Sequence, residues 1–284
     1  MDCRPPALAE EGSAKQEGGH PPVAMARVFH PVRRQGGYFL YQKTERDNCM
    51  EHWLSRTEAL IGTEQTQRLQ QAKVAILGLG GVGGAAAEAI CRAGVGNILL
   101  MDHDIVDITN INRQLFATTK TVGQEKCLAA AQRLQNINPD CKLTVHQTFY
   151  QADTRELLFQ FQPNFVIDAI DTVTSKLDLA VECQKRNVNL VMSMGTGNRI
   201  DPSKFQIGDI SDTAGCGCAL ARVMRRELKK RGILHQAVVY STEFPQTIVV
   251  DSSHGKHSPG SISFCPPVAG YCLASYVVQY LIKI

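Results

Sequence analysis

A glycine-rich loop between a short apolar strand and an alanine-rich helix constrains this chain more than any other feature. Lys73 to Leu77 (KVAIL) is an apolar run that stops at glycines, and Gly84 to Gly94 (GAAAEAICRAG) has helical spacing. The loop between them, residues 78 to 83, reads GLGGVG. Because glycines have no Cβ and a helix N-terminus carries partial positive charge, such a loop lets backbone N–H groups approach a phosphate. The pattern predicts a nucleotide site.

The next apolar run predicts a second strand with an acidic end. Asn97 to Met101 (NILLM) is followed by Asp102, whose carboxylate can accept hydrogen bonds from ribose hydroxyls. A glycine loop followed by an acid fits NAD, FAD and ATP equally well, and a dehydrogenase is the commonest interpretation. These residues alone leave the nucleotide open.

Polar side chains after this strand favour ATP. Asn110, Asn112, Arg113, Gln114 and Lys126 follow in a stretch that a hydride-transfer site would normally leave apolar. Arg113 and Lys126 place two positive charges within reach of one phosphate-binding loop, and fixed cations suit a triphosphate better than a nicotinamide ring. An NAD-dependent oxidoreductase is therefore disfavoured.

A third apolar run places another carboxylate at the same edge of the expected sheet. Phe165 to Ala169 (FVIDA) leads into Asp171, and further apolar runs at Leu190 to Met194 and Phe205 to Ile210 predict two more strands. Open α/β folds bind ligands at the carboxyl ends of parallel strands, and Mg²⁺ takes one or two carboxylates together with phosphate oxygens. We therefore predict a Rossmann-like, doubly wound α/β fold with a mainly parallel sheet, which binds ATP and Mg²⁺ and cleaves ATP between the α- and β-phosphates.

Five motifs in order, over roughly Ser55 to Gly197, resemble the adenylating superfamily of the ubiquitin-activating enzymes and the bacterial ThiF and MoeB proteins. The motifs are GxGGxG, DxD, N-x-x-R-Q, VGQxK and D-A-I-D-T. The resemblance implies a nucleotide site made of Gly78, Gly80, Gly81, Gly83, Asp102, Asp104, Asn110, Asn112, Arg113, Gln114, Lys126 and Asp171. Within it, Gly81 would line the phosphates and Asp102 the ribose, while Asn110 and Arg113 would hold phosphate oxygens. Lys126 would neutralise the leaving pyrophosphate, and Asp171 would bind Mg²⁺.

An upstream arginine implies a dimer through the same resemblance. The segment SRTEALIG contains Arg56 and is similar to the entry helix of the superfamily, S-R-x-x-x-L-x-G. In dimeric members such an arginine reaches into the ATP site of the partner. We therefore expect a homodimer in which Arg56 acts in catalysis.

Longer segments resemble one branch of the superfamily, the tRNA threonylcarbamoyladenosine dehydratases. They include SMGTGNRIDPSKFQIGDI, LARVMRRELKKRGI and PGSISFCPPVAGYCLAS, so the resemblance extends from about residue 52 to the C-terminus. It implies that ATP activates the threonyl carboxylate of a modified adenosine beside the anticodon, at position 37 of tRNA. A nitrogen of the same side chain then captures the activated carboxyl and gives a cyclic hydantoin, and the tether supplies the effective molarity of an intramolecular reaction.

An alternative is an adenylating partner for a sulfur-carrier or ubiquitin-like protein, whose C-terminal carboxylate would replace the nucleoside acid. That branch typically has two C-x-x-C pairs for a structural zinc and often an acyl-accepting cysteine. This chain has ten cysteines but no C-x-x-C. Cys216 and Cys218 lie in an AGCGCA turn, where a thiol role, adventitious metal binding and plain loop flexibility all stay open. A sulfur-transfer partner also stays open.

A basic helix predicts a tRNA contact. Between Leu220 and Arg231, Arg222, Arg225, Arg226 and Lys229 fall at i, i+3, i+4 and i+7 and form one stripe. A solvated helix face explains most such runs. Because the expected substrate is tRNA, we favour phosphate contacts, which would weaken with salt.

The rest of the chain predicts one α/β domain with extensions. Of 284 residues, 44% are hydrophobic and 20% charged, which is ample for a core. Residues 1 to about 50 are rich in Pro and Gly, and we expect a disordered extension before a domain at 51 to 284, with tRNA-binding and closing elements from about 198 to 284.

The apolar stretch from Val268 to Ile284 is shorter than a bilayer requires, so we expect a closing helix, no membrane insertion and a cytoplasmic protein with reduced cysteines.

Overall fold

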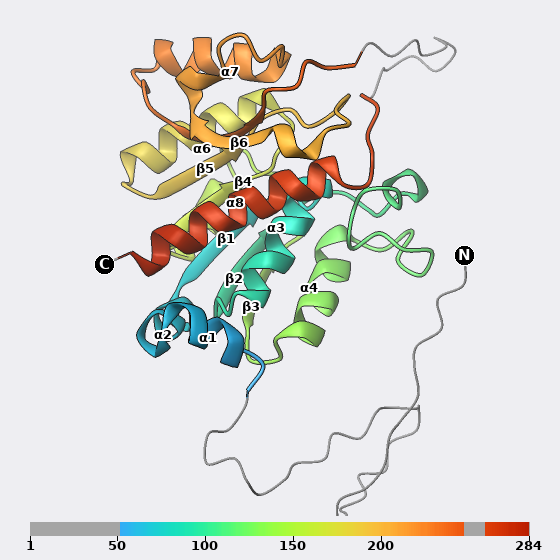
Figure 1. Cartoon of the computed structure of the whole chain (residues 1–284), viewed down its shortest axis with the longest axis vertical. Helices are drawn as coiled ribbons and strands as arrows, with labels where there is room; N and C mark the ends of the chain where they lie inside the picture. The colour runs from blue at the N-terminus through green and yellow to red at the C-terminus, as the bar shows by residue number, and fades with distance from the viewer. Residues whose placement is uncertain (1–51, 247–258, 284) are drawn as a thin grey trace, which may run out of the picture. The chain divides into compact units, whose positions relative to one another are not determined.

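A seven-stranded sheet forms the centre of the protein (Figure 1). The computed structural model describes residues 52–246 and 259–283, so the expectation for residues 1 to about 50 lies outside it. The strands are β1 (Lys73–Leu77), β2 (Asn97–Met101), β3 (Lys142–His146), β4 (Phe165–Asp168), β5 (Asn189–Ser193), β6 (Phe205–Asp209) and β7 (Ala237–Ser241). Their order is β3-β2-β1-β4-β5-β7-β6, and every neighbouring pair is parallel except β6 with β7. The predicted doubly wound, mainly parallel sheet is confirmed.

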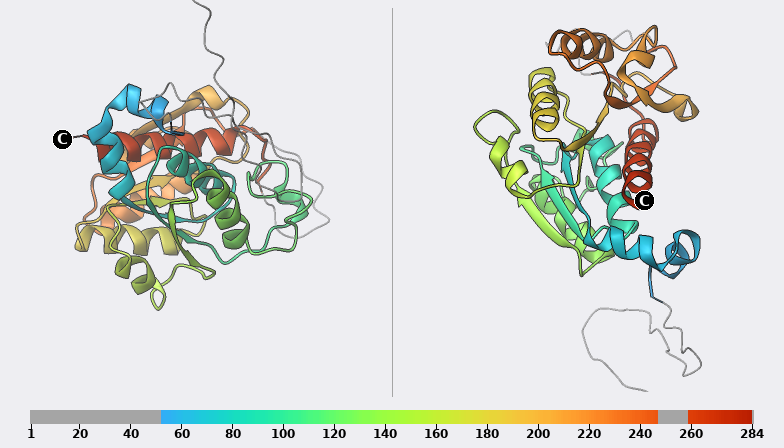
Figure 2. Two further views of the ribbon diagram at one scale, coloured as in Figure 1. Left: turned by 90° about the horizontal axis from the view of Figure 1, so that it is seen from below. Right: turned by 90° about the vertical axis from the view of Figure 1, so that its left-hand side faces the viewer.

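Helices cover both faces of this sheet (Figure 2). The helices are α1 (Ser55–Ile61), α2 (Thr63–Gln71), α3 (Gly81–Arg92), α4 (Lys126–Ile137), α5 (Arg155–Gln160), α6 (Val173–Lys185), α7 (Ala219–Lys230) and α8 (Cys265–Ile282), with 3-10 turns at Ile108–Asn110, Pro202–Lys204 and Ile210–Thr213. Side chains of β1 alternate between two cores, as the period of a strand requires. Val74 and Ile76 pack with α3, α4 and α8, whereas Ala75 and Leu77 pack with α5, α6 and α7.

The helix α8 lies against α3, on the face that also holds α4 (Figure 1). A Cβ at Gly270 would come within 2.2 Å of the Val82 carbonyl oxygen, so the two backbones approach as closely as they do because this residue is glycine. The predicted closing helix is therefore present, and it packs on the helix that follows the glycine loop. Among the described residues, no helix has both the length and the apolar character needed to cross a bilayer.

Two strands were not predicted from the sequence, and they change the position of a third. Lys142–His146 forms edge strand β3, and Ala237–Ser241 forms β7. Strand β7 inserts beside β5, so β6 pairs with β7 alone and becomes the opposite, antiparallel edge. The C-terminal elements expected from about residue 198 thus contribute two strands to the same sheet.

The strand order creates a crevice beside β1. From β1 the chain continues to β2 on one side, and later returns to β4 on the other side. Ligands of open α/β sheets bind at such a reversal, outside the carboxyl ends of the strands. In this chain those ends are Leu77, Met101, Asp168 and Ser193.

Candidate active site

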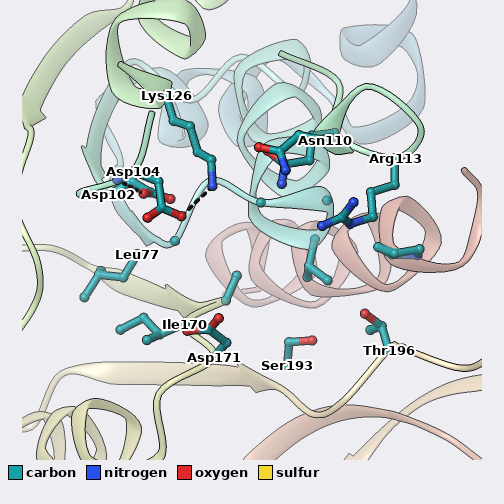
Figure 3. A pocket seen from close by; sticks show the side chains of 18 of the residues that line it. Leu77, Asp102, Asp104, Asn110, Arg113, Lys126, Ile170, Asp171, Ser193 and Thr196 are labelled. Atoms are coloured by element: carbon teal, nitrogen blue, oxygen red, sulfur yellow. Dashed lines mark hydrogen bonds and ion pairs between the residues drawn. The ribbon is translucent and has the colours of Figure 1, made fainter. Parts of the chain in front are cut away.

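A cavity of about 520 Å³ opens at the carboxyl ends of β1, β2, β4 and β5. It brings together ten of the residues predicted to bind the nucleotide: Gly78, Gly80, Gly81, Asp102, Asp104, Asn110, Arg113, Gln114, Lys126 and Asp171. Figure 3 shows Lys126, Asn110 and Arg113 on one side of the cavity and Asp171, Ser193 and Thr196 on the other. Cations and a carboxylate therefore face one another across a single pocket.

The glycine loop presents backbone amides to this pocket. Helix α3 begins at Gly81, and its N-cap residue, Gly80, has no side chain to cap the first turn. The first N–H groups of a helix lack intrahelical partners, and the helix dipole adds partial positive charge there. Gly78 has a φ of 85°, which favours glycine, and a Cβ on Gly83 would meet the Gly78 carbonyl oxygen at 1.7 Å. The loop has the geometry that an anionic phosphate requires.

Asp102 is held at the end of β2 by two backbone amides. Its carboxylate accepts from the N–H of Leu79 at 2.5 Å and from the N–H of Asp104 at 2.8 Å. The side chain is buried, and the residue lines the cavity. Each carboxylate oxygen has a second lone pair, so the residue can still accept a hydrogen bond from a ribose hydroxyl.

Lys126, the first residue of α4, carries a buried ammonium group. The residue is 6% exposed, and its Nζ lies 2.6 Å from Asp104 Oδ2. Asp102, His103 and Asp104 lie close enough together to resemble a metal site. Because the Lys126 ammonium already pairs with Asp104 and would repel a second cation at this cluster, we assign no metal there. The pair instead holds a fixed cation beside the glycine loop.

Arg113 and Asn110 reach the cavity from the segment that follows β2. Asn110 is buried, and its Oδ1 accepts from the Asp107 N–H, which closes a capping box around a 3-10 turn. Arg113 Nη1 donates to the Thr109 carbonyl at 2.8 Å and to Asn112 Oδ1 at 3.0 Å. Figure 3 shows the guanidinium directed into the cavity. The turn therefore positions a second cation for phosphate oxygens.

Asp171 follows β4 and, like Asp104, is an exposed carboxylate of the pocket. Among the described residues, its one side-chain partner is the Thr172 hydroxyl, which donates to Oδ1 at 3.2 Å. Asp171 has free oxygen lone pairs and shares the cavity with the glycine loop, so its carboxylate fits Mg²⁺, which prefers such ligands.

Three predicted site residues lie elsewhere. Gly83 and Asn112 do not line the cavity: Gly83 allows the loop to pack closely, and Asn112 donates to the Ser261 carbonyl at 3.1 Å. Arg56 is exposed on α1, which leads through α2 to the amino end of β1, whereas the cavity opens at the carboxyl end. Arg56 therefore does not contribute to the pocket of its own chain.

The cavity also contains residues that the sequence did not indicate. His103, Thr148, Phe149 and Tyr150 form the wall next to β2, and the His103 and Phe149 rings meet edge to face at 4.8 Å between centroids. Three of them follow β3, so predicting that strand would have indicated them. Ser193 and Thr196 lie at the carboxyl end of β5, where Gly195 and Gly197 also line the cavity.

Only three of the four basic side chains in the stripe on α7 are exposed to solvent. Arg222, Arg226 and Lys229 are exposed, while Met224 and Leu228 are buried on the other side of the helix. Arg225 is half-buried, and its Nη1 donates to Thr213 Oγ1 at 2.8 Å. This arginine belongs to the stripe by spacing, but its guanidinium anchors the helix to the preceding turn.

An acidic residue at the end of α7 engages neighbouring cations. Glu227 lies 3.1 Å from Arg226, 3.0 Å from Lys230 and 2.9 Å from Arg231. Hydrogen bonds from Lys230, Arg231 and Arg226 lower the pKa of this carboxyl to about 2. Glu227 is therefore ionised at any ordinary pH and partly neutralises the basic face.

The two turn cysteines are buried rather than exposed. Cys218 is the N-cap of α7, and its Sγ accepts from the Ala221 N–H at 3.4 Å. A Cβ on Gly195 would lie 3.0 Å from the same sulfur. These contacts account for Cys218 by packing and capping.

Comparison with known proteins identifies the family of the chain and several relatives. Residues 54–284 match the family model described as ThiF family. The tRNA threonylcarbamoyladenosine dehydratase of Bacillus subtilis is 43% identical over 246 residues, which cover 82% of this chain and 96% of that protein. The Escherichia coli protein of the same name is 37% identical over 202 residues, covering 67% and 75%. The crystal structure of the E. coli dehydratase in complex with ATP superimposes with a TM-score of 0.73 at 32% identity, covering 81% of this chain and 93% of that one.

Fold and site together define a Rossmann-like nucleotide-binding protein whose glycine loop is accompanied by fixed cations. The chain belongs to the ThiF family, and the resemblance noted in its sequence is confirmed.

Proposed function

We propose that this protein is an ATP-dependent tRNA threonylcarbamoyladenosine dehydratase, which cyclises N6-threonylcarbamoyladenosine at position 37 of tRNA. The observation that carries the proposal is the convergence of Arg113, Lys126 and Asp171 on one cavity with the glycine loop. Similarity over most of the length of two proteins with that name supports the substrate. A soluble tRNA as substrate agrees with the expected cytoplasmic location, which stays a prediction.

The first step is adenylation of the substrate carboxylate. A carboxylate oxygen attacks the α-phosphorus of ATP, the bond between that phosphorus and the bridging oxygen breaks, and pyrophosphate leaves. Amides of the glycine loop, Arg113 and Lys126 oppose the negative charge that develops on phosphate oxygens. Because Lys126 is buried and paired with Asp104, its ammonium needs little reorganisation when this charge appears.

Mg²⁺ would be held by Asp171, where it would offset the charge of the phosphates. The exposed carboxylate and its weak engagement with Thr172 support this assignment.

The second step closes the ring within the substrate. A nitrogen of the same side chain attacks the activated carboxyl carbon, the bond to the AMP oxygen breaks, and the nitrogen loses a proton. Since both reacting groups belong to one side chain, no enzyme nucleophile is required. The buried positions of Cys216 and Cys218 agree with this scheme. The sulfur-carrier alternative is not favoured, because the chain lacks paired C-x-x-C motifs and because the relatives at 43% and 37% identity are both named tRNA threonylcarbamoyladenosine dehydratase.

We also propose a homodimer in which Arg56 enters the cavity of the partner subunit. Its exposure on α1, remote from the carboxyl edge of its own sheet, supports action on another copy. The exposed cations of α7 would contact tRNA phosphates.

The function is tested by incubating the purified protein with ATP, Mg²⁺ and tRNA that carries threonylcarbamoyladenosine. Mass spectrometry of the nucleosides should detect loss of one water from the modified adenosine, with release of AMP and pyrophosphate. Unmodified adenosine at the same position is the control. Pyrophosphate release with a carrier protein but none with this tRNA would contradict the proposal.

A further inference from the structure

A lysine and an aspartate form an ion pair that is completely enclosed behind the cavity. Lys176 of α6 and Asp168 at the end of β4 are both 0% exposed, and Nζ lies 2.9 Å from Oδ2. Lysine and aspartate are almost never fully buried unless they are paired. The pair does not line the cavity, so it has no direct part in binding the nucleotide.

The same two side chains hold the peptide groups on both sides of Ile170. Lys176 Nζ donates to the Ile170 carbonyl at 3.1 Å, and the Ile170 N–H donates to Asp168 Oδ1 at 2.9 Å. The next residue is Asp171, and the backbone N–H of Lys176 donates to the Thr172 carbonyl at 3.1 Å. Asp171 therefore lies between Ile170, which the Lys176 side chain holds, and Thr172, which the first turn of α6 holds through the backbone.

This short loop also touches the glycine loop. The Ala169 N–H donates to the Leu77 carbonyl at 2.9 Å, and a Cβ on Gly78 would meet the Ala169 carbonyl oxygen at 2.6 Å. The position of the carboxylate is thus set relative to the phosphate-binding amides.

Stability alone is a weak reason to keep such a pair. Burial raises the pKa of the Asp168 carboxyl, while Lys176 acts in the opposite direction. Well-packed apolar residues of similar volume often replace a buried ion pair with no loss of stability. A role that apolar residues cannot fill is to fix the two peptide groups on either side of Ile170, the second of which joins Ile170 to Asp171.

We propose that Lys176 and Asp168 are positioning residues that hold the Asp171 carboxylate in place for the divalent cation of the nucleotide. The inference rests on the proposed function, which assigns that cation to Asp171. It adds a buried ion pair, Lys176 with Asp168, that holds the Ile170 backbone without contacting ATP or the metal; we call this pair the clamp.

The test uses the full-length protein with ATP and Mn²⁺ as the probe, without tRNA, and follows free Mn²⁺ by electron paramagnetic resonance. Lys176→Met leaves Asp168 buried without its cation and is expected to lower thermal stability. The double variant Asp168→Leu with Lys176→Met refills the site with apolar side chains and should recover that stability. We expect both variants to bind Mn²⁺ about tenfold more weakly, because residues that orient a metal ligand typically affect metal affinity by that amount or more.

Two controls separate positioning from general damage. ATP affinity in EDTA should stay unchanged in both variants, since the phosphate-binding loop keeps its residues. Lys185→Met, which removes an exposed lysine of the same helix that pairs with Glu182, should leave Mn²⁺ binding unchanged. A double variant with wild-type stability and wild-type Mn²⁺ affinity would overturn the inference.

Asp171→Asn distinguishes this inference from the proposal beneath it. If Asp171→Asn weakens Mn²⁺ binding and the double variant does not, the clamp alone is refuted. If Asp171→Asn has no effect, the metal assignment itself is wrong, and the clamp is overturned with it.

Discussion

The molecule carries its functional positive charge in two regions that differ in how the charge is held. In the cavity, Lys126 is buried with one carboxylate partner, and Arg113 is fixed by a turn. On α7, Arg222 and Lys229 extend into solvent, and Arg226 shares Glu227 with its neighbours. A fixed cation in a partly desolvated site acts on one developing charge, whereas mobile surface cations contribute screened, additive attraction. Substitutions in the two regions should therefore differ in size and in what they change.

The largest effect is expected in the cavity. Lys126→Ala should lower the rate of the tRNA reaction about 10²- to 10³-fold, because removing one preorganised group costs that much in comparable sites. ATP-dependent pyrophosphate release in single-turnover assays measures it. Lys120→Ala, at an exposed lysine of the same segment, is the matched control. Equal rates for the two variants would remove the distinction between the regions.

Substitution of Arg56 tests whether the cavity needs a positive charge from a second subunit. Arg56→Ala should be nearly inactive alone, as should Lys126→Ala, but a mixture of the two should regain activity. Random re-pairing makes half of the dimers mixed, each with one intact site, so about a quarter of wild-type activity is expected. A mixture without activity would contradict action across a dimer.

Charge reversal on α7 should change tRNA binding and leave ATP binding unchanged. Arg222→Glu with Lys229→Glu is cleaner than a change at Arg225, because Arg225 anchors the helix to Thr213. We expect tRNA affinity to fall about tenfold or more at low salt, and the dependence of affinity on salt to become shallower. Titrations at several salt concentrations test this, and a parallel loss of ATP binding would contradict it.

The smallest effect is expected when the surface cations are released. Glu227→Gln removes the shared carboxylate and should tighten tRNA binding a few-fold, roughly the gain from freeing one phosphate-binding charge. Because Lys230, Arg231 and Arg226 lower the pKa of Glu227 to about 2, any stabilisation from its charge is present above its ordinary value of 4.5 and is lost only as pH falls toward 2. Wild-type tRNA affinity should therefore show no transition due to Glu227 between pH 5 and 8. A transition that disappears in Glu227→Gln would refute this.

The cavity was predictable from sequence where side chains follow an apolar run directly. Asp102 and Asp171 were placed correctly in the cavity, because carboxyl ends of parallel strands share one edge of a sheet. Strand β3 was missed because its residues Lys142 to His146 are partly exposed at an edge and lack a strong apolar signal. Because β3 was not predicted, nothing in the sequence placed Phe149 and its neighbours at the carboxyl edge of the sheet.

Features that depend on distant pairing were not predictable. Strand β7 inserts beside β5, and β6 therefore becomes an antiparallel edge strand. The hydrophobic pattern within a single strand does not indicate which strand it pairs with. Lys176 reads as an ordinary helix lysine, and its burial follows from the docking of α6 over Asp168. The Arg225 contact with Thr213 likewise depends on how the preceding turn folds back on α7.

The close contact between α8 and the start of α3 determines when the nucleotide site can be completed during synthesis of the chain. A Cβ on Gly81 would come within 2.8 Å of Pro266 Cβ, so the first turn of α8 forms a wall of the phosphate loop. This helix follows every described strand of the sheet in the chain, so its contacts with α3 cannot form before residues 265–282 have been synthesised. A nascent chain that has completed all seven described strands therefore still lacks one wall of its nucleotide site.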